Sequence, residues 1–105
     1  MRKKIVIFPF PFTDLSDSKK RPCLVLKDYG HEDLLLALIT TQKRKDEYSI
    51  NFNDNDLGSG RIFHESVIRT NRLFTGSKNY ITKEIAVLKD EKFEEVISLI
   101  HKTII

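Results

Sequence analysis

The sequence is poor in the residues that support a disulfide framework or a membrane span. Cys23 is the only cysteine among 105 residues, so no disulfide can form within the chain. The first apolar run, residues 5–8, ends at Pro9 and is too short for the hydrophobic part of a secretory signal. These absences predict a protein of a reducing compartment, the cytoplasm, that has no membrane partner.

The sequence also lacks the motifs that accompany the common cofactors. It contains no zinc-ligand spacing, no phosphate-binding glycine loop, no nucleophile elbow and no carboxylate-dense metal motif. We therefore predict neither a metal site nor a cofactor. Cys23 stands inside an apolar run, where a cysteine is more often a small core residue than a nucleophile.

What the sequence does have is a balance of apolar and charged residues that suits one compact core. Hydrophobic residues make up 40% of the chain and charged residues 31%. At this length there is no room for a second core, so we predict one domain over residues 1–105. The formal net charge of +3 permits an anionic partner without requiring one.

Short β-rich segments separated by turns fill the first half of the chain. Residues 5–8 form the first segment, and the prolines that follow lack the amide that a sheet needs, so this strand is predicted to run out at an edge or barrel rim. Two apolar runs, residues 22–27 and 34–40, flank a turn at 28–30 and predict a hairpin. Residues 48–52 alternate with period two, as a half-buried strand does.

The second half adds more strands and one helix. Turn residues fill 53–60, and strands are predicted at 62–70, 73–75 and 84–88. The period then changes, with Asp90 as the predicted N-cap of a helix. The mainly β pattern therefore predicts a small β-barrel or strongly bent sheet covered by a C-terminal α-helix. The predicted helix carries one apolar stripe made of Phe93, Val96, Ile97, Ile100 and Ile104.

Basic residues gather where the predicted strands begin or end. If the strands close into one small barrel, these ends form a groove that suits a phosphate backbone. The alternative is that the loop lysines are ordinary solvated charges. Arg21 differs from them because Pro22 fixes the backbone where a loop enters an apolar strand. The three basic groups are Lys19, Lys20 and Arg21; Lys43, Arg44 and Lys45; and Arg69 and Arg72.

An ordered set of motifs runs through nearly the whole chain. Residues 5–14 read Ile-Val-Ile-Phe-Pro-Phe-Pro-Phe-Thr-Asp, and Lys20-Arg21-Pro22 follows, with further matching segments at 39–41, 66–69, 73–75 and 85–88. In order and spacing this set resembles the MazF/PemK family of toxins from bacterial toxin–antitoxin pairs. The resemblance implies an SH3-like β-barrel of the CcdB/MazF type with a C-terminal helix. It also implies a homodimer, a cognate antitoxin, and metal-independent, sequence-selective endoribonuclease activity on single-stranded RNA (an mRNA interferase).

The resemblance implies roles for individual residues as well. Arg21 occupies the family's catalytic arginine position, where a guanidinium can grip phosphate oxygens through two parallel hydrogen bonds. Thr40 matches the active-site threonine, which would hydrogen-bond the scissile phosphate or the 2′-hydroxyl. Contacts to RNA are expected from Lys19, Lys20, Lys43, Arg44, Ser66, Arg69 and Asn71.

The proton acceptor of such a reaction is left open by the sequence. Some family members have an acid two residues after the groove arginine, where this chain has Asn71, which cannot act as a carboxylate base. The remaining candidates are Glu65, His64, Asp14 and a bound water. A second departure is Lys3-Lys4, where the family often has Gly-Asp.

Two other classes of function stay open at this point. One is a non-catalytic member of the fold that binds RNA, or that poisons DNA gyrase as barrels of the CcdB group do. The other is a domain whose only function is to bind its antitoxin.

Overall fold

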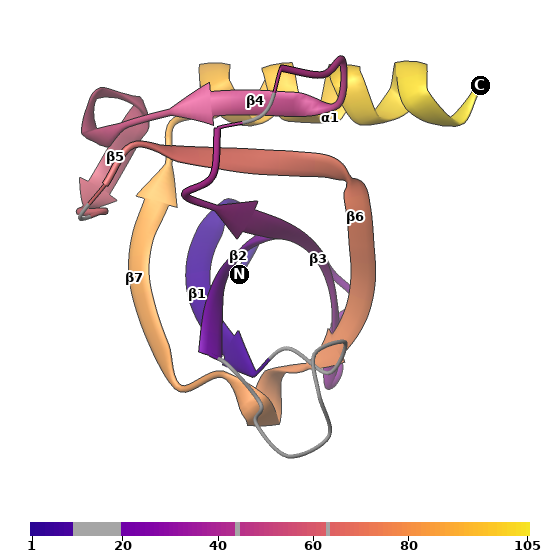
Figure 1. Ribbon diagram of the computed structural model, residues 1–105. Coiled ribbons are helices and arrows are strands. Elements are labelled where there is room, and N and C mark those ends of the chain that lie inside the picture. Colours follow the sequence, from indigo (N-terminus) through magenta and orange to yellow (C-terminus); the bar gives the residue numbers. More distant parts are fainter. Residues whose placement is uncertain (10–19, 44, 63) are drawn as a thin grey trace.

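The chain folds into a strongly curved antiparallel sheet with one helix, in a computed structural model that describes residues 1–9, 20–43, 45–62 and 64–105. Figure 1 shows the strands curling into a ring, with α1 lying across one end of it. Seven strands are hydrogen-bonded in the order β4-β6-β3-β2-β1-β7-β5, so the described part of the sheet is barrel-like without closing. The elements are β1 Lys4–Pro9, β2 Lys20–Asp28, β3 Asp33–Thr40, β4 Ser49–Phe52, η1 Asp54–Asp56, β5 Leu57–Gly60, β6 Ser66–Ser77, η2 Lys78–Tyr80, β7 Lys83–Leu88 and α1 Asp90–Ile104.

The predicted architecture, a mainly β bent sheet with a C-terminal helix, is confirmed. The two apolar runs form the hairpin of β2 and β3, and Gly30 takes a φ of 87° in the turn between them, a conformation that favours glycine. The alternating segment is β4, where Ile50 and Phe52 are buried and Asn51 is exposed.

Two predictions for the second half were wrong. Residues 57–60 were predicted as turn, yet they form the edge strand β5, in which Gly60 lies against the backbone of β7. The strands predicted at 62–70 and 73–75 are one strand, β6, which bends sharply in Figure 1. Leu38 of β3 pairs with Arg69 of β6, but the preceding residue, Ala37, pairs with Leu73. The polar residues 70–72 therefore form a bulge that does not end the strand.

The position of β1 was predicted only in part. This strand lies between β2 and β7, so it is not an edge strand. Its pairing with β7 reaches Ile7, however, while Pro9 pairs only with Lys20 of β2. The missing proline amide therefore falls where β1 has run past one of its two neighbours.

The helix begins one residue away from the predicted cap. Lys89 is the N-cap, without a side-chain capping bond, and Asp90 is the first helical residue. The Asp90 carboxylate instead forms an ion pair with Lys3. Of the predicted apolar stripe, Phe93 is fully buried but Ile104 is 74% exposed. Among the described residues, none of the helices has the length and apolar character needed to cross a membrane.

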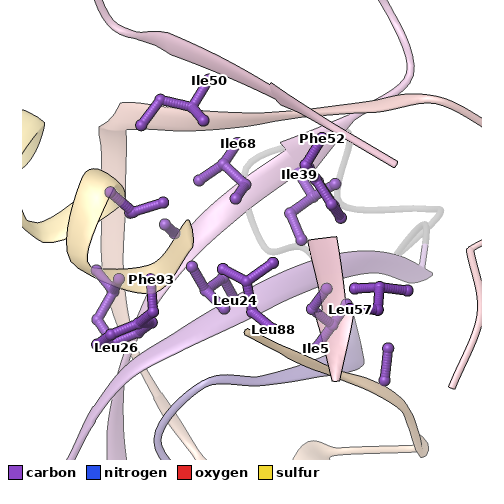
Figure 2. Packing of buried hydrophobic residues seen from close by; sticks show 13 residues of the cluster. Ile5, Leu24, Leu26, Ile39, Ile50, Phe52, Leu57, Ile68, Leu88 and Phe93 are labelled. Carbon is purple, nitrogen blue, oxygen red and sulfur yellow. The ribbon is translucent and has the colours of Figure 1, made fainter. Parts of the chain in front are cut away.

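Apolar side chains pack on both faces of the curved sheet. Figure 2 shows the first cluster, which contains Leu24, Ile39 and Ile68 of the sheet together with Phe93 of α1. Burying a side chain of this size stabilises the fold by about 1.5–3 kcal/mol. The second cluster lies on the opposite face, because its members alternate along the strands with those of the first. It contains Val6, Phe8, Cys23, Val25, Leu34 and Leu36.

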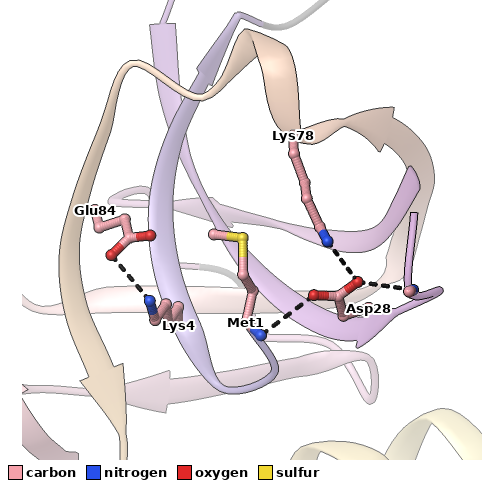
Figure 3. A network of polar contacts seen from close by, with 6 residues as sticks. Met1, Lys4, Asp28, Lys78 and Glu84 are labelled. Carbon is pink, nitrogen blue, oxygen red and sulfur yellow. Dashed lines mark hydrogen bonds and ion pairs between the residues drawn. The ribbon is translucent and has the colours of Figure 1, made fainter. Parts of the chain in front are cut away.

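A polar network joins the turn between β2 and β3 to the end of β6. Figure 3 shows the Asp28 carboxylate accepting from Lys78 Nζ at 2.8 Å, with the Met1 amino group 3.4 Å away. Gly30 N also donates to this carboxylate, at 2.9 Å. The hydrogen bonds from Lys78 and then Gly30 lower the pKa of Asp28 from 3.8 to about 2.

Gly60 provides a test of the closeness of β5 and β7. It has a φ of 78°, and an added Cβ would overlap the Ile85 carbonyl oxygen. We expect Gly60→Ala to lower the free energy of unfolding by about 2 kcal/mol or more, since strain and overlap add. Gly58→Ala is the matched control, because its Cβ would meet only Val87 O at an ordinary 3.7 Å. Equal urea midpoints for the two variants would contradict this account of β5.

Asp28 gives the fold a predictable response to acid. Its folded pKa of about 2 lies below the ordinary 3.8, so the ionised carboxylate stabilises the fold above pH 4 and loses this effect as the pH falls towards 2. The difference in unfolding free energy between wild type and Asp28→Asn should therefore shrink across this range. Urea unfolding at several pH values measures it, and a difference that stays constant from pH 5 to 2 would refute the assignment.

Candidate active site

Arg21 and Thr40 lie at the same end of the sheet and on the same face. In the antiparallel pair of β2 and β3, Cys23 is opposite Leu38. Arg21 lies two residues before Cys23 on β2, and Thr40 lies two residues after Leu38 on β3, so both are at the same end of the pair. Residues two apart on a strand share a face. Arg21 is also opposite Phe8 of β1, a member of the second apolar cluster. The structure thus brings a guanidinium and a hydroxyl together at the rim of that cluster.

The guanidinium of Arg21 has unused hydrogen-bonding capacity. The side chain is half-buried, and its Nε is buried without a hydrogen-bond partner. Leaving a buried donor without an acceptor costs about 1–3 kcal/mol. None of the ion pairs within residues 1–9, 20–43, 45–62 and 64–105 involves Arg21. An anion that reached this guanidinium would therefore bind without first displacing a described carboxylate.

The Thr40 hydroxyl is oriented by the chain that follows it. Gln42 N donates to Thr40 Oγ1 at 3.2 Å. A hydroxyl that accepts from a backbone amide keeps its own hydrogen available as a donor. Thr40 is opposite Val67 on β6, so the hydroxyl lies at the junction of β3 with the start of β6.

Arg69 shares the face of Arg21 and Thr40 but lies deeper. It is opposite Leu38 on one side and Ser49 on the other, and its side chain is only 7% exposed. Its Nη2 lies 3.3 Å from Asn71 Oδ1 and 3.6 Å from Asp46 Oδ2. In contrast to Arg21, this guanidinium already has a carboxylate beside it.

Ser66 is the predicted site residue that lies on the other face. It is opposite Phe52, a member of the first apolar cluster, and it is itself buried. Its hydroxyl donates to the His64 carbonyl at 2.9 Å. The structure therefore does not bring Ser66 together with Arg21 and Thr40.

The remaining predicted contacts are at the surface or outside the described residues. Lys20 is exposed at the start of β2, and Lys43 is exposed with its Nζ 3.3 Å from Glu65 Oε2. Asn71 is exposed and accepts from Arg69. Lys19, Arg44 and Asp14 lie outside the described residues.

A cleft of about 310 Å³ lies beyond the ends of β4 and the start of β6. Two of the candidate proton acceptors, His64 and Glu65, line it, and Glu65 is also paired with Lys43. Among the described residues, its lining includes the carboxylates of Asp54 and Glu65 but no lysine or arginine, so this part of the surface suits a phosphate poorly. The described residues that line it are Asn53, Asp54, Asn55, Ile62, His64 and Glu65.

Among the described residues, Cys23 and the potential metal ligands do not form a second reactive centre. Burial raises the pKa of the Cys23 thiol to about 12, so the sulfur stays protonated and is a poor nucleophile. Within the ranges that the structure describes, no group of three or more His, Cys, Asp and Glu side chains lies close enough to hold a metal ion.

Sequence reasoning missed Asp46, the carboxylate beside Arg69. In this part of the chain the sequence draws attention only to the basic residues Lys43, Arg44 and Lys45. The available signal was an acid three residues before a serine at a strand start, a spacing at which Asp side chains bond to the local chain. Asp46 does this: its Oδ1 accepts from Tyr48 N and from Ser49 Oγ, each at 2.9 Å.

Solved structures share this fold. An endoribonuclease from a mycobacterial species, in complex with its cognate antitoxin, aligns with a TM-score of 0.77 and 9% identity, over 97% of this chain and 91% of that chain. The Mycobacterium tuberculosis toxin MazF-mt6 aligns with a TM-score of 0.74 and 19% identity, over 94% and 93%. At these identities the likeness establishes the fold alone.

The sequence defines the family. Residues 1–104 match the profile of the PemK-like, MazF-like toxins of type II toxin–antitoxin systems, and the chain belongs to this family. Among proteins of curated function, none matches the chain. The resemblance inferred from the ordered motifs is thereby confirmed.

The burial of Arg69 leads to a stability prediction. Arg69→Met keeps much of the side-chain volume but removes the charge beside Asp46, so we expect the free energy of unfolding to fall by about 2–3 kcal/mol. Arg72→Met is the control, because Arg72 is exposed on the same strand and such changes usually stay within about 0.5 kcal/mol. Chemical denaturation measures both, and a loss for Arg69→Met no larger than for Arg72→Met would contradict the buried placement.

Proposed function

We propose that this toxin-family protein is a metal-independent, sequence-selective endoribonuclease that cleaves single-stranded RNA. The observation that carries the proposal is the Arg21 guanidinium, which has no described ion pair and shares one rim of the sheet with the Thr40 hydroxyl. The similar mycobacterial structure that was solved with its antitoxin is an endoribonuclease, which supports the same activity here.

The proposed reaction uses the nucleophile that RNA carries. The 2′-oxygen attacks the adjacent phosphorus, the bond from phosphorus to the 5′-oxygen breaks, and the products are a 2′,3′-cyclic phosphate and a 5′-hydroxyl. Negative charge grows on the nonbridging oxygens during the attack. Two N–H groups of Arg21 and the hydroxyl of Thr40 would donate to these oxygens.

Arg21 acts in this scheme through its charge. A free guanidinium holds its proton too tightly to be an efficient acid, so stabilisation of the phosphorane-like transition state is its main contribution. The scheme needs no carboxylate at position 71, because a water molecule can take the 2′ proton and return one to the leaving 5′-oxygen.

The surrounding cations would hold the RNA backbone. Lys20 and Lys43 are exposed near the ends of β2 and β3 that carry Arg21 and Thr40. In the sequence, Lys19 is adjacent to Lys20 and Arg44 is adjacent to Lys43. Phosphate contacts of this kind bind RNA without selecting its sequence.

The biological setting follows from the family. A cognate antitoxin is the proposed partner, as in the mycobacterial complex, and a second copy of the chain completes the homodimer that the resemblance implies. The cytoplasm, where mRNA is translated, is the proposed place of action.

The experiment is a cleavage assay on single-stranded RNA in the presence of EDTA, with the wild type and Arg21→Ala compared at saturating RNA. We expect products that end in a 2′,3′-cyclic phosphate. The rate of the variant should be at least about 100-fold lower than that of the wild type, because the variant lacks the main positive charge that stabilises the transition state. Arg61→Ala, another arginine-to-alanine change at an exposed position and outside the three basic groups, is expected to keep the wild-type rate.

Each other outcome has a clear meaning. Intact RNA across a diverse set of sequences would refute the proposed activity. Binding without cleavage would instead favour a non-catalytic RNA-binding member of the fold, for which the replacement of an acid by Asn71 is the supporting observation. A full rate in Arg21→Ala would remove Arg21 from the mechanism.

A further inference from the structure

The segment 41–48, of which the structure describes every residue except Arg44, joins β3 to β4 and carries two exposed lysines. Lys43 and Lys45 are both exposed, as are most of their neighbours, so the apolar core does not fix this segment. Polar contacts tie it down near both ends. Near its start, Gln42 N donates to Thr40 Oγ1, and near its end Tyr48 N donates to the carboxylate of Asp46.

The carboxylate of Asp46 is occupied on both oxygens. Its Oδ1 accepts from Tyr48 N and Ser49 Oγ, each at 2.9 Å, which folds the end of the segment around the side chain. Its Oδ2 lies 3.6 Å from Arg69 Nη2. The first two contacts are local, whereas the third links the segment to a different strand.

Arg69 is a firm anchor for this link. It lies on β6, between β3 and β4, with its side chain 7% exposed, and it is directly opposite Ser49. The packing of its aliphatic stem holds a buried guanidinium in place. Separating such a guanidinium from its carboxylate lowers the stability of the fold strongly, because a buried charge is left uncompensated. The Asp46 side chain is 31% exposed, so the pair spans the boundary between core and surface.

We propose that Asp46 is a positioning residue of the RNA-cleaving site, which holds segment 41–48 against buried Arg69 so that Lys43 and Lys45 meet the RNA backbone beside Thr40. This inference rests on the proposed function and adds a residue to it. It also gives Arg69 an indirect role: the buried guanidinium holds Asp46, and Asp46 in turn positions the two lysines that contact the RNA.

The geometry separates this role from that of a proton acceptor. A base needs a free lone pair aimed at the 2′-hydroxyl, whereas the Asp46 oxygens already accept two hydrogen bonds and face a guanidinium. Positioning predicts weaker binding with little change in the chemical step. A base at Asp46 predicts the reverse.

The first experiment measures binding of a 2′-O-methyl oligonucleotide of the sequence that the wild type cuts, across a range of salt concentrations. Asp46→Asn keeps an oxygen for the local bonds and removes the charge opposite Arg69. We expect about tenfold weaker binding and a salt slope reduced by roughly 1.4, because each phosphate contact to a single strand contributes about 0.7. Glu84→Gln, which removes an exposed pair with Lys4, is the control and should leave the slope unchanged.

The second experiment is a double-mutant cycle with Lys43→Ala and Lys45→Ala made together. If Asp46 acts through these lysines, Asp46→Asn should weaken binding no further in that background. Asp46→Glu, which restores the charge, should recover part of the lost slope. Equal weakening in both backgrounds would overturn the proposal, as would a fall in kcat with KM unchanged in the cleavage assay.

Two controls keep the result interpretable. Melting curves of each variant show whether it is folded at the assay temperature; if Asp46→Asn is not, Ser49→Ala removes one donor to the same carboxylate and should lower the slope by a smaller amount. The cleavage assay of the wild type is done first. A wild type that cuts no RNA defeats the proposed function, whereas a wild type that cuts RNA with an Asp46→Asn slope equal to its own defeats only this inference.

Discussion

Residues that lie directly opposite one another in an antiparallel sheet point to the same face, and this constraint decides which cations of the chain can act together. It places Arg21, Thr40 and Arg69 on one face and turns Ser66 towards the helix. Because each strand of the sheet is registered against its neighbours, a shift of one residue would exchange the two faces and separate Arg21 from Thr40. The apolar clusters on both sides oppose such a shift, so the packing of the core also protects the arrangement of the candidate site.

Two arginines on that face have opposite electrostatic circumstances. Arg69 is buried with Asp46 beside it, whereas Arg21 is half-buried and has no described ion pair. A guanidinium that already has a carboxylate gains less from a phosphate than one that has none. Similar cations in the sequence therefore divide into one suited to holding the protein together and one suited to holding a ligand.

Much of the fold was predictable, because apolar alternation and a change to helical spacing are local signals. They identified the β2–β3 hairpin, β4 and the helix. They failed at β5, where Gly60, one of the glycines that signalled a turn, lets two backbones approach closely. They also failed at the bulge of β6, where polar residues interrupt the pattern without interrupting the strand. In both places a long-range pairing overrides the local preference.

The candidate site was predictable to a similar extent. Arg21 and Thr40 carry distinct sequence contexts, namely a proline-fixed strand entry and a strand end. Asp46 does not, since its importance depends on a guanidinium 23 positions later that only the folded sheet brings near. The depth of Arg69 was hidden for the same reason: a basic residue at the end of an apolar run gives no sign of whether its side chain reaches solvent.

Cys23 lies two residues from Arg21 on the same face, and its burial has a chemical consequence beyond packing. Oxidants and alkylating reagents attack thiolates, and a thiol with a pKa of about 12 supplies almost none at neutral pH. The sulfur nearest the candidate site is thus kept out of the redox chemistry of the cell while β2 stays in the sheet. Modification of Cys23 would accordingly record the detachment of that strand, and with it the loss of the surface that Arg21 and Thr40 share.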